Sequence, residues 1–161
     1  LPVFARDVLH VGAPGLGWLL SASGAGALAG GITLSALAGR IRRGKLLLGA
    51  SLGFTLLIAA FASSRSFALS LALLAAAGFA MILNNGLVNT LLQSLVPNEL
   101  RGRVMSVYVF MYLGMTPLGS LQAGALARWL GAPAAVAIGA AVLVVIILVT
   151  WSRIPELREV R

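Results

Sequence analysis

The chain has 161 residues and a formal net charge of +8, with 60% hydrophobic and only 10% charged residues. A soluble domain carries about 25% charged residues, so this composition excludes an ordinary water-facing surface and predicts a membrane protein. The sequence contains no Cys, one His and four acidic residues. This excludes disulfides and thiolate metal sites and argues against an enzyme, a metal centre or a bound cofactor.

Charged residues divide the chain into five uncharged runs, each long enough for the roughly 20 apolar residues that cross a bilayer. The first run starts with an irregular stretch that contains Gly and Pro, so we place its helix from about residue 15. The predicted fold is an all-α, polytopic transmembrane helical bundle with five spans, at about 15–37, 46–62, 67–95, 104–127 and 133–151.

The five spans form one bundle over residues 15–152, between an external lead-in at 1–14 and a tail at 153–161. Residues 1–4 are interpreted either as the outer end of a preceding membrane helix or as an interfacial lead-in. Because the connections between spans are short, we expect sequential spans to pack as antiparallel neighbours.

Basic residues fall unequally on the two sides of the predicted bundle, nine on one side and three on the other. The positive-inside rule assigns the richer side to the cytoplasm, which puts the amino end outside and the carboxyl tail inside. These charges lie between apolar spans and do not form one soluble surface. We therefore expect no nucleic-acid partner. The nine are Arg40, Arg42, Arg43, Lys45, Arg101, Arg103, Arg153, Arg158 and Arg161, and the three are Arg6, Arg65 and Arg128.

Small residues recur four positions apart in several predicted spans. Residues 24–29 (GAGALA) also fit a dinucleotide-binding pattern, but they lie inside an apolar span with no preceding strand. Small residues at this spacing let helices approach closely within a membrane, as fixed packing or as sliding surfaces. The candidate packing pairs are Gly26 and Gly30, Gly49 and Gly53, and Ser120 and Gly124.

The third predicted span carries four amide side chains: Asn84, Asn85, Asn89 and Gln93. The last three share one helix face, because they are spaced four residues apart. An unpaired amide in mid-membrane is costly, so these side chains should face other helices or a wet cavity. Two interpretations stay open: they line a substrate pathway, or they only hydrogen-bond to neighbouring helices.

The fourth predicted span contains Tyr108, Tyr112 and Met115 at spacings of three and four residues. Tyr and Met combine apolar bulk with a polar or polarizable atom, which suits a site for amphiphilic ligands. The alternative interpretation is that these residues only pack in the hydrophobic core. Pro117 removes a backbone donor and predicts a bend near the middle of this helix.

Three stretches of the chain resemble the second half of the major facilitator superfamily, in its branch of bacterial multidrug and siderophore exporters. Residues 96–108 (VPNELRGRVMSVY) are similar to the cytoplasmic loop between helices 10 and 11 of that branch. Residues 1–9 (LPVFARDVL) resemble the outer end of helix 7, and residues 114–131 resemble helix 11. The resemblance implies that the chain corresponds to the end of helix 7 and helices 8 to 12.

The resemblance also implies a gate built from the cytoplasmic loops. The family often has an acidic residue in the loop between helices 8 and 9, where this sequence has Gly39. Glu99 could therefore supply the charge contacts nearby, with Arg101 and Arg103. The residues implied for the loops and gate are Arg40, Arg42, Arg43, Glu99, Arg101 and Arg103.

The first functional hypothesis is the C-terminal half of an exporter of small amphiphilic molecules in the bacterial cytoplasmic membrane. It would work by alternating access, with a site between two helical halves, and would need its N-terminal half as well as the lipid bilayer. The pathway candidates are Asn84, Asn85, Asn89, Gln93, Tyr108, Tyr112 and Met115. The alternative hypothesis is a non-transporting, transporter-derived subunit that packs against a larger membrane protein complex.

Overall fold

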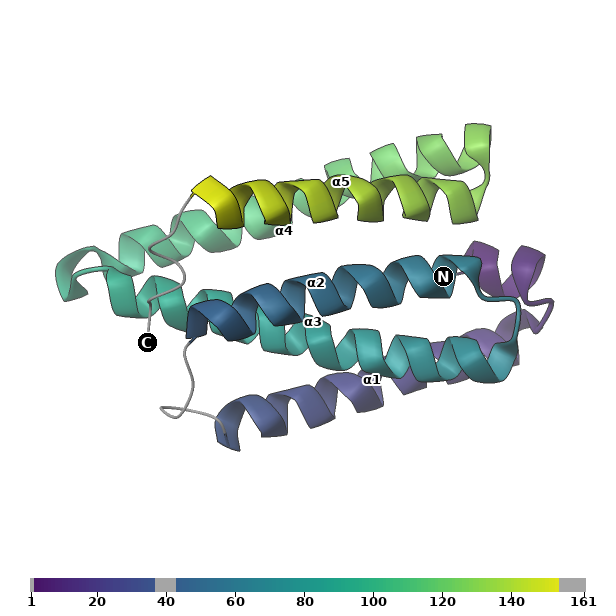
Figure 1. Ribbon diagram of the computed structural model, residues 1–161, viewed down its shortest axis with the longest axis horizontal. Coiled ribbons are helices and arrows are strands. Elements are labelled where there is room, and N and C mark those ends of the chain that lie inside the picture. Colours follow the sequence, from purple (N-terminus) through teal and green to yellow (C-terminus); the bar gives the residue numbers. More distant parts are fainter. Residues whose placement is uncertain (1, 37–42, 154–161) are drawn as a thin grey trace.

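The computed structural model describes residues 2–36 and 43–153, with Arg43 described by its backbone alone (Figure 1). The predicted positions Arg40 and Arg42, the Arg43 side chain and the tail at 154–161 lie outside the described part. The elements are η1 (Phe4–Val8), α1 (Gly12–Ala36), α2 (Arg43–Ser63), α3 (Phe67–Leu95), α4 (Asn98–Leu130) and α5 (Ala132–Arg153).

All five α-helices are long and apolar enough to cross a membrane, and the described residues contain no strand. The predicted all-α polytopic membrane bundle is therefore confirmed. The third helix occupies 67–95, as expected, whereas α2 starts at Arg43 and α5 extends to Arg153.

The first helix begins at Gly12, three residues before the expected start. The first four N–H groups of a helix have no intrahelical acceptor, so Pro14 loses no hydrogen bond in this first turn. Before it, the chain forms the π-helical turn η1, in which the Leu9 N–H donates to the Phe4 carbonyl at 2.8 Å. Much of the expected irregular lead-in is therefore helical.

The fourth helix begins at Asn98, six residues before the expected start at 104. Pro97 is its N-cap residue, and Glu99 lies in the first turn, where a negative charge is favoured by the helix dipole. The charged residues come before the apolar run begins, but they are already part of the helix. Only two residues, Val96 and Pro97, separate α3 from α4.

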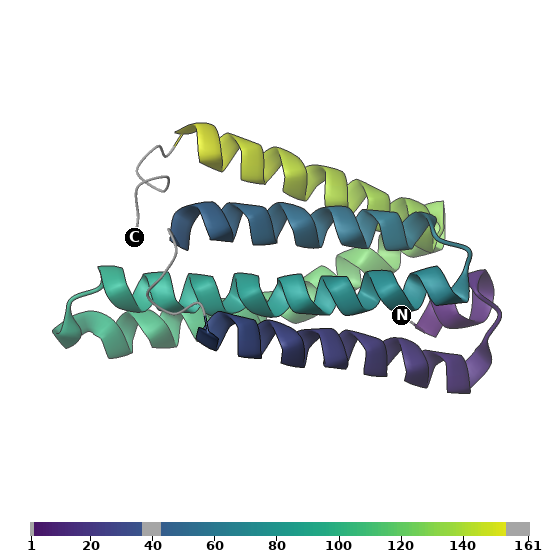
Figure 2. The same ribbon diagram turned by 60° about the horizontal axis from the view of Figure 1, so that its bottom comes forward.

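Helix α3 lies between α1 and α2, while α5 packs on α2 and α4 packs on α5 (Figures 1 and 2). The expectation of antiparallel sequential neighbours is wrong for α1 and α2, because α1 makes its main contact with α3. Helices α1 and α3 run in the same direction. Their contact is favoured because glycines on both helices let the two backbones approach closely.

The core consists of two clusters along α3. One lies at the η1 end, where the Phe4 and Phe61 ring centroids are 4.8 Å apart and Leu19 and Leu74 are buried beside them. The other contains Ala50 of α2 with Leu83 and Leu87 of α3. No residue of α4 is buried, so this helix is positioned mainly by its contact with α5.

Candidate functional site

Two adjacent amides of α3 face different helices. The Ser51 hydroxyl of α2 donates to the Asn84 amide oxygen at 3.1 Å, in a partly buried position. The Asn85 amide nitrogen donates to the Tyr112 hydroxyl of α4 at 3.4 Å. Successive residues of an α-helix point about 100° apart, which explains the divergence. Asn84 thus joins α3 to α2, and Asn85 faces α4.

The amide side chains of Asn85, Asn89 and Gln93 lie on one face of α3. The Gln93 amide nitrogen donates to the Asn89 amide oxygen one turn away. Asn85 and Asn89 are half-buried, and Gln93 is exposed near the end of the helix. This face keeps hydrogen-bonding atoms within reach of a ligand, because none of its three amide side chains is fully buried.

The aromatic residues of α4 lie opposite this amide face. The rings of Tyr108 and Tyr112 are stacked, with centroids 6.1 Å apart and planes inclined by 28°. Tyr112 and Met115 remain 52% and 62% exposed. Helices α3 and α4 are antiparallel and joined at residues 96–97. Positions 89 and 108 therefore lie at the same height along the two helices, and so do positions 85 and 112.

The site offers hydrogen bonds and apolar contact surface without charge. Amide and phenol groups both donate and accept, and the Tyr rings and the Met thioether add apolar area. Within residues 2–36 and 43–153, no group of three His, Cys, Asp or Glu side chains is placed to hold a metal ion. The arrangement suits binding of a molecule with apolar and hydrogen-bonding parts.

Over residues 1–161, the chain matches the family described as transmembrane secretion effector. The protein belongs to this major facilitator-like family. With its five apolar helices it is a transporter-like integral membrane protein. Neither the curated proteins nor the solved structures contain a match to the chain.

In this family member, the residues at the start of α4 that the resemblance implies for a gate form no ion pair with another described side chain. Glu99, Arg101 and Arg103 are exposed. The ion pair found among the described residues joins Arg6 to Asp7 in η1 instead. The structure therefore does not bring Glu99 together with Arg101 or Arg103, although positions 99 and 103 are one helical turn apart.

The candidate packing residues fall into two groups. A Cβ atom added to Gly26 would lie 1.8 Å from the Ala75 carbonyl oxygen, and one on Gly30 would lie 2.7 Å from that of Phe79. Gly49, Gly53 and Gly124 have no such neighbour within 4 Å. The exposed Ser120 donates its hydroxyl to a carbonyl of its own helix.

Sequence reasoning missed the partner glycine on α3. A Cβ atom on Gly78 would lie 2.1 Å from the Ser23 carbonyl oxygen, so Gly78 belongs to the same close contact as Gly26. Gly78 does not belong to a pair of small residues four positions apart, because the residue four positions further along is Ile82. Gly86, eight residues further along the same helix face, was the feature of the sequence that could have indicated Gly78 as a contact residue.

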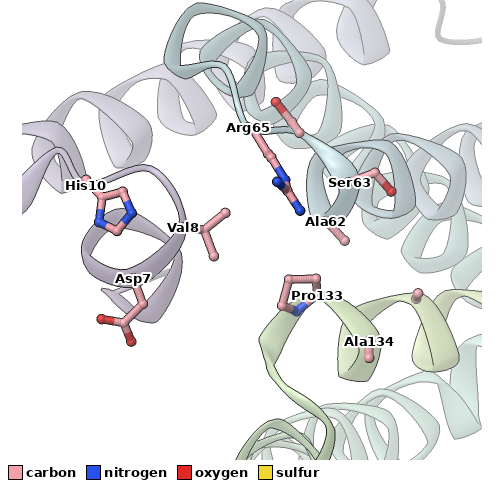
Figure 3. Close-up of a pocket in the computed structure, with 10 residues that line it drawn as sticks. Asp7, Val8, His10, Ala62, Ser63, Arg65, Pro133 and Ala134 are labelled. Atoms are coloured by element: carbon pink, nitrogen blue, oxygen red, sulfur yellow. The ribbon is translucent and has the colours of Figure 1, made fainter.

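A cavity of about 550 Å³, lined by both polar and apolar residues, lies at the η1 end of the bundle. Figure 3 shows Asp7 and His10 on one side of it, and Arg65 and Pro133 across from them. The hydrogen bond from the Arg6 guanidinium holds the pKa of the Asp7 carboxyl below its usual range; desolvation acts against this lowering, and the charge of Arg6 adds to it. Sequence reasoning placed Asp7, His10 and Arg65 outside the membrane and Pro133 at the start of the fifth span, and it did not foresee that they share a cavity.

Proposed function

We propose that this chain is the C-terminal half of an exporter that moves small amphiphilic molecules by alternating access. The supporting observation is the Asn85–Tyr112 hydrogen bond, which joins α3 and α4 while both side chains remain accessible. The pathway face consists of Asn85, Asn89 and Gln93 with Tyr108, Tyr112 and Met115. Asn84 is left out of it, because Ser51 already engages its amide oxygen.

The openness of this face supports the half-transporter assignment. Alternating access needs a site enclosed between two repeats that move against each other, and α3 and α4 provide one wall. Helix α4 has no buried residue, so a second helical half can cover it without displacing any packed side chain. Export from a bacterial cytoplasm, with the amino end outside, belongs to the same proposal and rests on the resemblance and on the unequal basic residues.

The test compares two variants of the full-length protein, a double substitution and a single control, assayed by efflux of the amphiphilic dye Nile red from cells. Asn85→Leu together with Asn89→Leu should lower efflux about 10-fold at equal membrane insertion, because each lost hydrogen bond weakens binding by about 0.5–1.5 kcal/mol. Asn84→Leu is the matched control and should leave efflux per folded molecule unchanged. Equal efflux by both variants and the unsubstituted protein would remove Asn85 and Asn89 from the pathway.

A second candidate function is a non-transporting subunit of a larger membrane complex. The uncovered α4 supports it as well, because an apolar helix with no buried residue can pack against another membrane protein. Purification in a mild detergent distinguishes the two: stoichiometric foreign subunits support the subunit function. A protein that is purified alone and transports Nile red supports the exporter.

A further inference from the structure

The cavity at the η1 end of the bundle brings together charged and polar side chains from separate parts of the chain. Asp7 and His10 come from η1 and the residues just after it, and Arg65 comes from the turn between α2 and α3. Figure 3 shows Arg65 across the cavity from Asp7 and His10. The volume of about 550 Å³ is within the range of small-molecule sites, roughly 300–1,000 Å³. The pathway face on α3 and α4 uses none of these residues.

Arg65 is free to bind an anion in this cavity. Its side chain is exposed, as is that of His10. Among the residues that the structure describes, no hydrogen bond or ion pair engages the Arg65 guanidinium or the His10 ring. A guanidinium presents five N–H donors in a fixed plane, which suits the oxygen atoms of a phosphate.

Hydrogen bonds fix the turn that carries Arg65. The Ser64 hydroxyl donates to the Ser66 carbonyl at 3.2 Å and accepts from the Ser70 hydroxyl at 3.0 Å. Ser64 and Ser70 are both buried. The backbone at Arg65 is therefore held in place, while its side chain remains available to a ligand.

Asp7 supplies the opposite charge on the facing wall. The Arg6 Nε donates to Asp7 Oδ1 at 2.6 Å, and the Arg6 Nη2 donates to Oδ2 at 3.4 Å. Arg6 does not line the cavity. A carboxylate has about four lone-pair positions, so Asp7 can also accept from a ligand ammonium group. The cavity thus offers a carboxylate on one side and a guanidinium on the other.

The wall that carries Asp7 has an uncommon backbone conformation. Residues Phe4–Val8 form the π-helical turn η1, and the Val11 N–H then donates to the Ala5 carbonyl at 2.9 Å. His10 has a positive φ of 53°. Isolated π turns are rare and recur at functional sites, as do residues in sparsely populated backbone conformations. Both features lie at the cavity wall.

The cavity lies at the level where the apolar helices end. Helix α2 ends at Ser63, α3 begins at Phe67 and α5 begins at Ala132. Trp129 in the last turn of α4 is 86% exposed at the same end, and indole rings prefer the membrane interface. The headgroup layers lie just outside the roughly 30 Å hydrocarbon core, so phospholipid headgroups can reach this cavity.

We propose that this cavity binds a phospholipid headgroup that carries both a phosphate and a primary ammonium group, as in phosphatidylethanolamine. Arg65 and His10 bind the phosphate, and Asp7 accepts from the ammonium group. A headgroup with a phosphate alone brings a second negative charge near Asp7 without a cation to balance it, so the site selects the zwitterion. The lipid site is separate from the pathway face and exists whether or not the protein transports.

The test is native mass spectrometry of the full-length protein, purified in detergent and freed of lipid. The protein is titrated with phosphatidylethanolamine or with phosphatidylglycerol of identical acyl chains. The variants are Arg65→Gln and Asp7→Asn, and the matched control is Arg128→Gln. Arg128 is exposed in the last turn of α4, at the same end of the bundle, but it does not line the cavity. Equal thermal unfolding midpoints in detergent verify that all variants fold.

Phosphatidylethanolamine should bind the unsubstituted protein about 3- to 5-fold more tightly than phosphatidylglycerol, the effect of one additional exposed charge contact. Arg65→Gln should weaken the binding of both lipids. Asp7→Asn should abolish the preference without weakening phosphatidylglycerol, and Arg128→Gln should change neither lipid. Equal affinity of the unsubstituted protein for the two lipids would overturn the proposal. Equal losses in Arg128→Gln and Arg65→Gln would overturn it too, because they indicate attraction to surface charge in general.

Soluble O-phosphoethanolamine distinguishes the two sources of this headgroup chemistry. It should displace the lipid only at a much higher concentration, because it lacks the acyl chains that hold a lipid against the apolar helices. Displacement at the concentration at which the lipid itself binds would overturn the lipid assignment, and would give the cavity to a soluble zwitterion.

Discussion

Gly26 lies where α1 and α3 approach most closely, facing the backbone of Ala75. The membrane offers no hydrophobic force between helices, so such contacts are held by close van der Waals packing. A side chain at this position can be accommodated only if the two helices move apart. That movement would loosen every contact along their shared face, including the one at Gly78.

Gly26→Ala is expected to destabilise the protein by about 1–3 kcal/mol, the usual cost of overpacking a tight contact. Gly49→Ala is the matched control: this glycine is also helical, but a Cβ there meets no atom within 4 Å. The control should stay within about 0.5 kcal/mol of the unsubstituted protein. Unfolding in mixed micelles by increasing SDS measures both, and equal unfolding midpoints would contradict the packing assigned to Gly26.

Residue spacing alone identified both glycine pairs, and it grouped Asn85, Asn89 and Gln93 on one face. Spacing describes one helix, whereas a contact depends on two helices and their register. The sequence therefore could not distinguish Gly26, which lies against the backbone of α3, from Gly49, where an added Cβ atom would meet no atom within 4 Å. For the same reason it could not foresee that Asn84 meets Ser51 while Asn85 meets Tyr112.

Helix α4 has no buried residue, and one of its backbone hydrogen bonds is missing. Pro117 lies inside the helix and has no N–H, so the Leu113 carbonyl lacks its usual donor. The site residues Tyr108 and Tyr112 lie on the amino-terminal side of this break, and Ala123 and Ala127, which line a groove together with α5, lie beyond it. The break therefore separates the half of α4 that bears the site from the half that lines a groove with α5.

Pro117→Ala is expected to raise thermal stability and to lower Nile red efflux at least 2-fold. Alanine restores the missing backbone hydrogen bond and favours the helix, and the stiffened α4 then moves less easily between two conformations. The control is Gly119→Ala, because Gly119 is exposed and has no neighbour within 4 Å of an added Cβ. Differential scanning fluorimetry and dye efflux measure the two effects, and unchanged efflux in a stabilised variant would exclude a role for the break.

The limits of the elements were predictable where apolar runs and helices coincide, as in α3. They were not predictable at α4, because charged residues mark the edge of the hydrocarbon layer and a helix can continue into water beyond it. Glu99 and Arg101 are good helix residues at the start of α4, so nothing in their chemistry stops the helix.

For the whole molecule, the order of contact is α1, α3, α2, α5, α4, which differs from the order along the chain. The number of helices follows from charge spacing, but their neighbours do not. The membrane helices are apolar around most of their circumference, so hydrophobic periodicity marks no single buried face. Neighbours are instead selected by local shape, such as the fit of Gly26 and Gly78 at the α1–α3 contact.

The two ends of α3 provide a test of orientation for the whole bundle. Ser66 precedes this helix and Gly102 follows it by seven residues, and both are exposed. Neither Ser66→Cys nor Gly102→Cys alters the charge bias on which the positive-inside prediction depends. In intact cells, a membrane-impermeant maleimide should label Ser66→Cys from outside and reach Gly102→Cys only after the cells are permeabilised. The reverse pattern would invert the orientation, and labelling of both from outside would mean that α3 does not span the membrane.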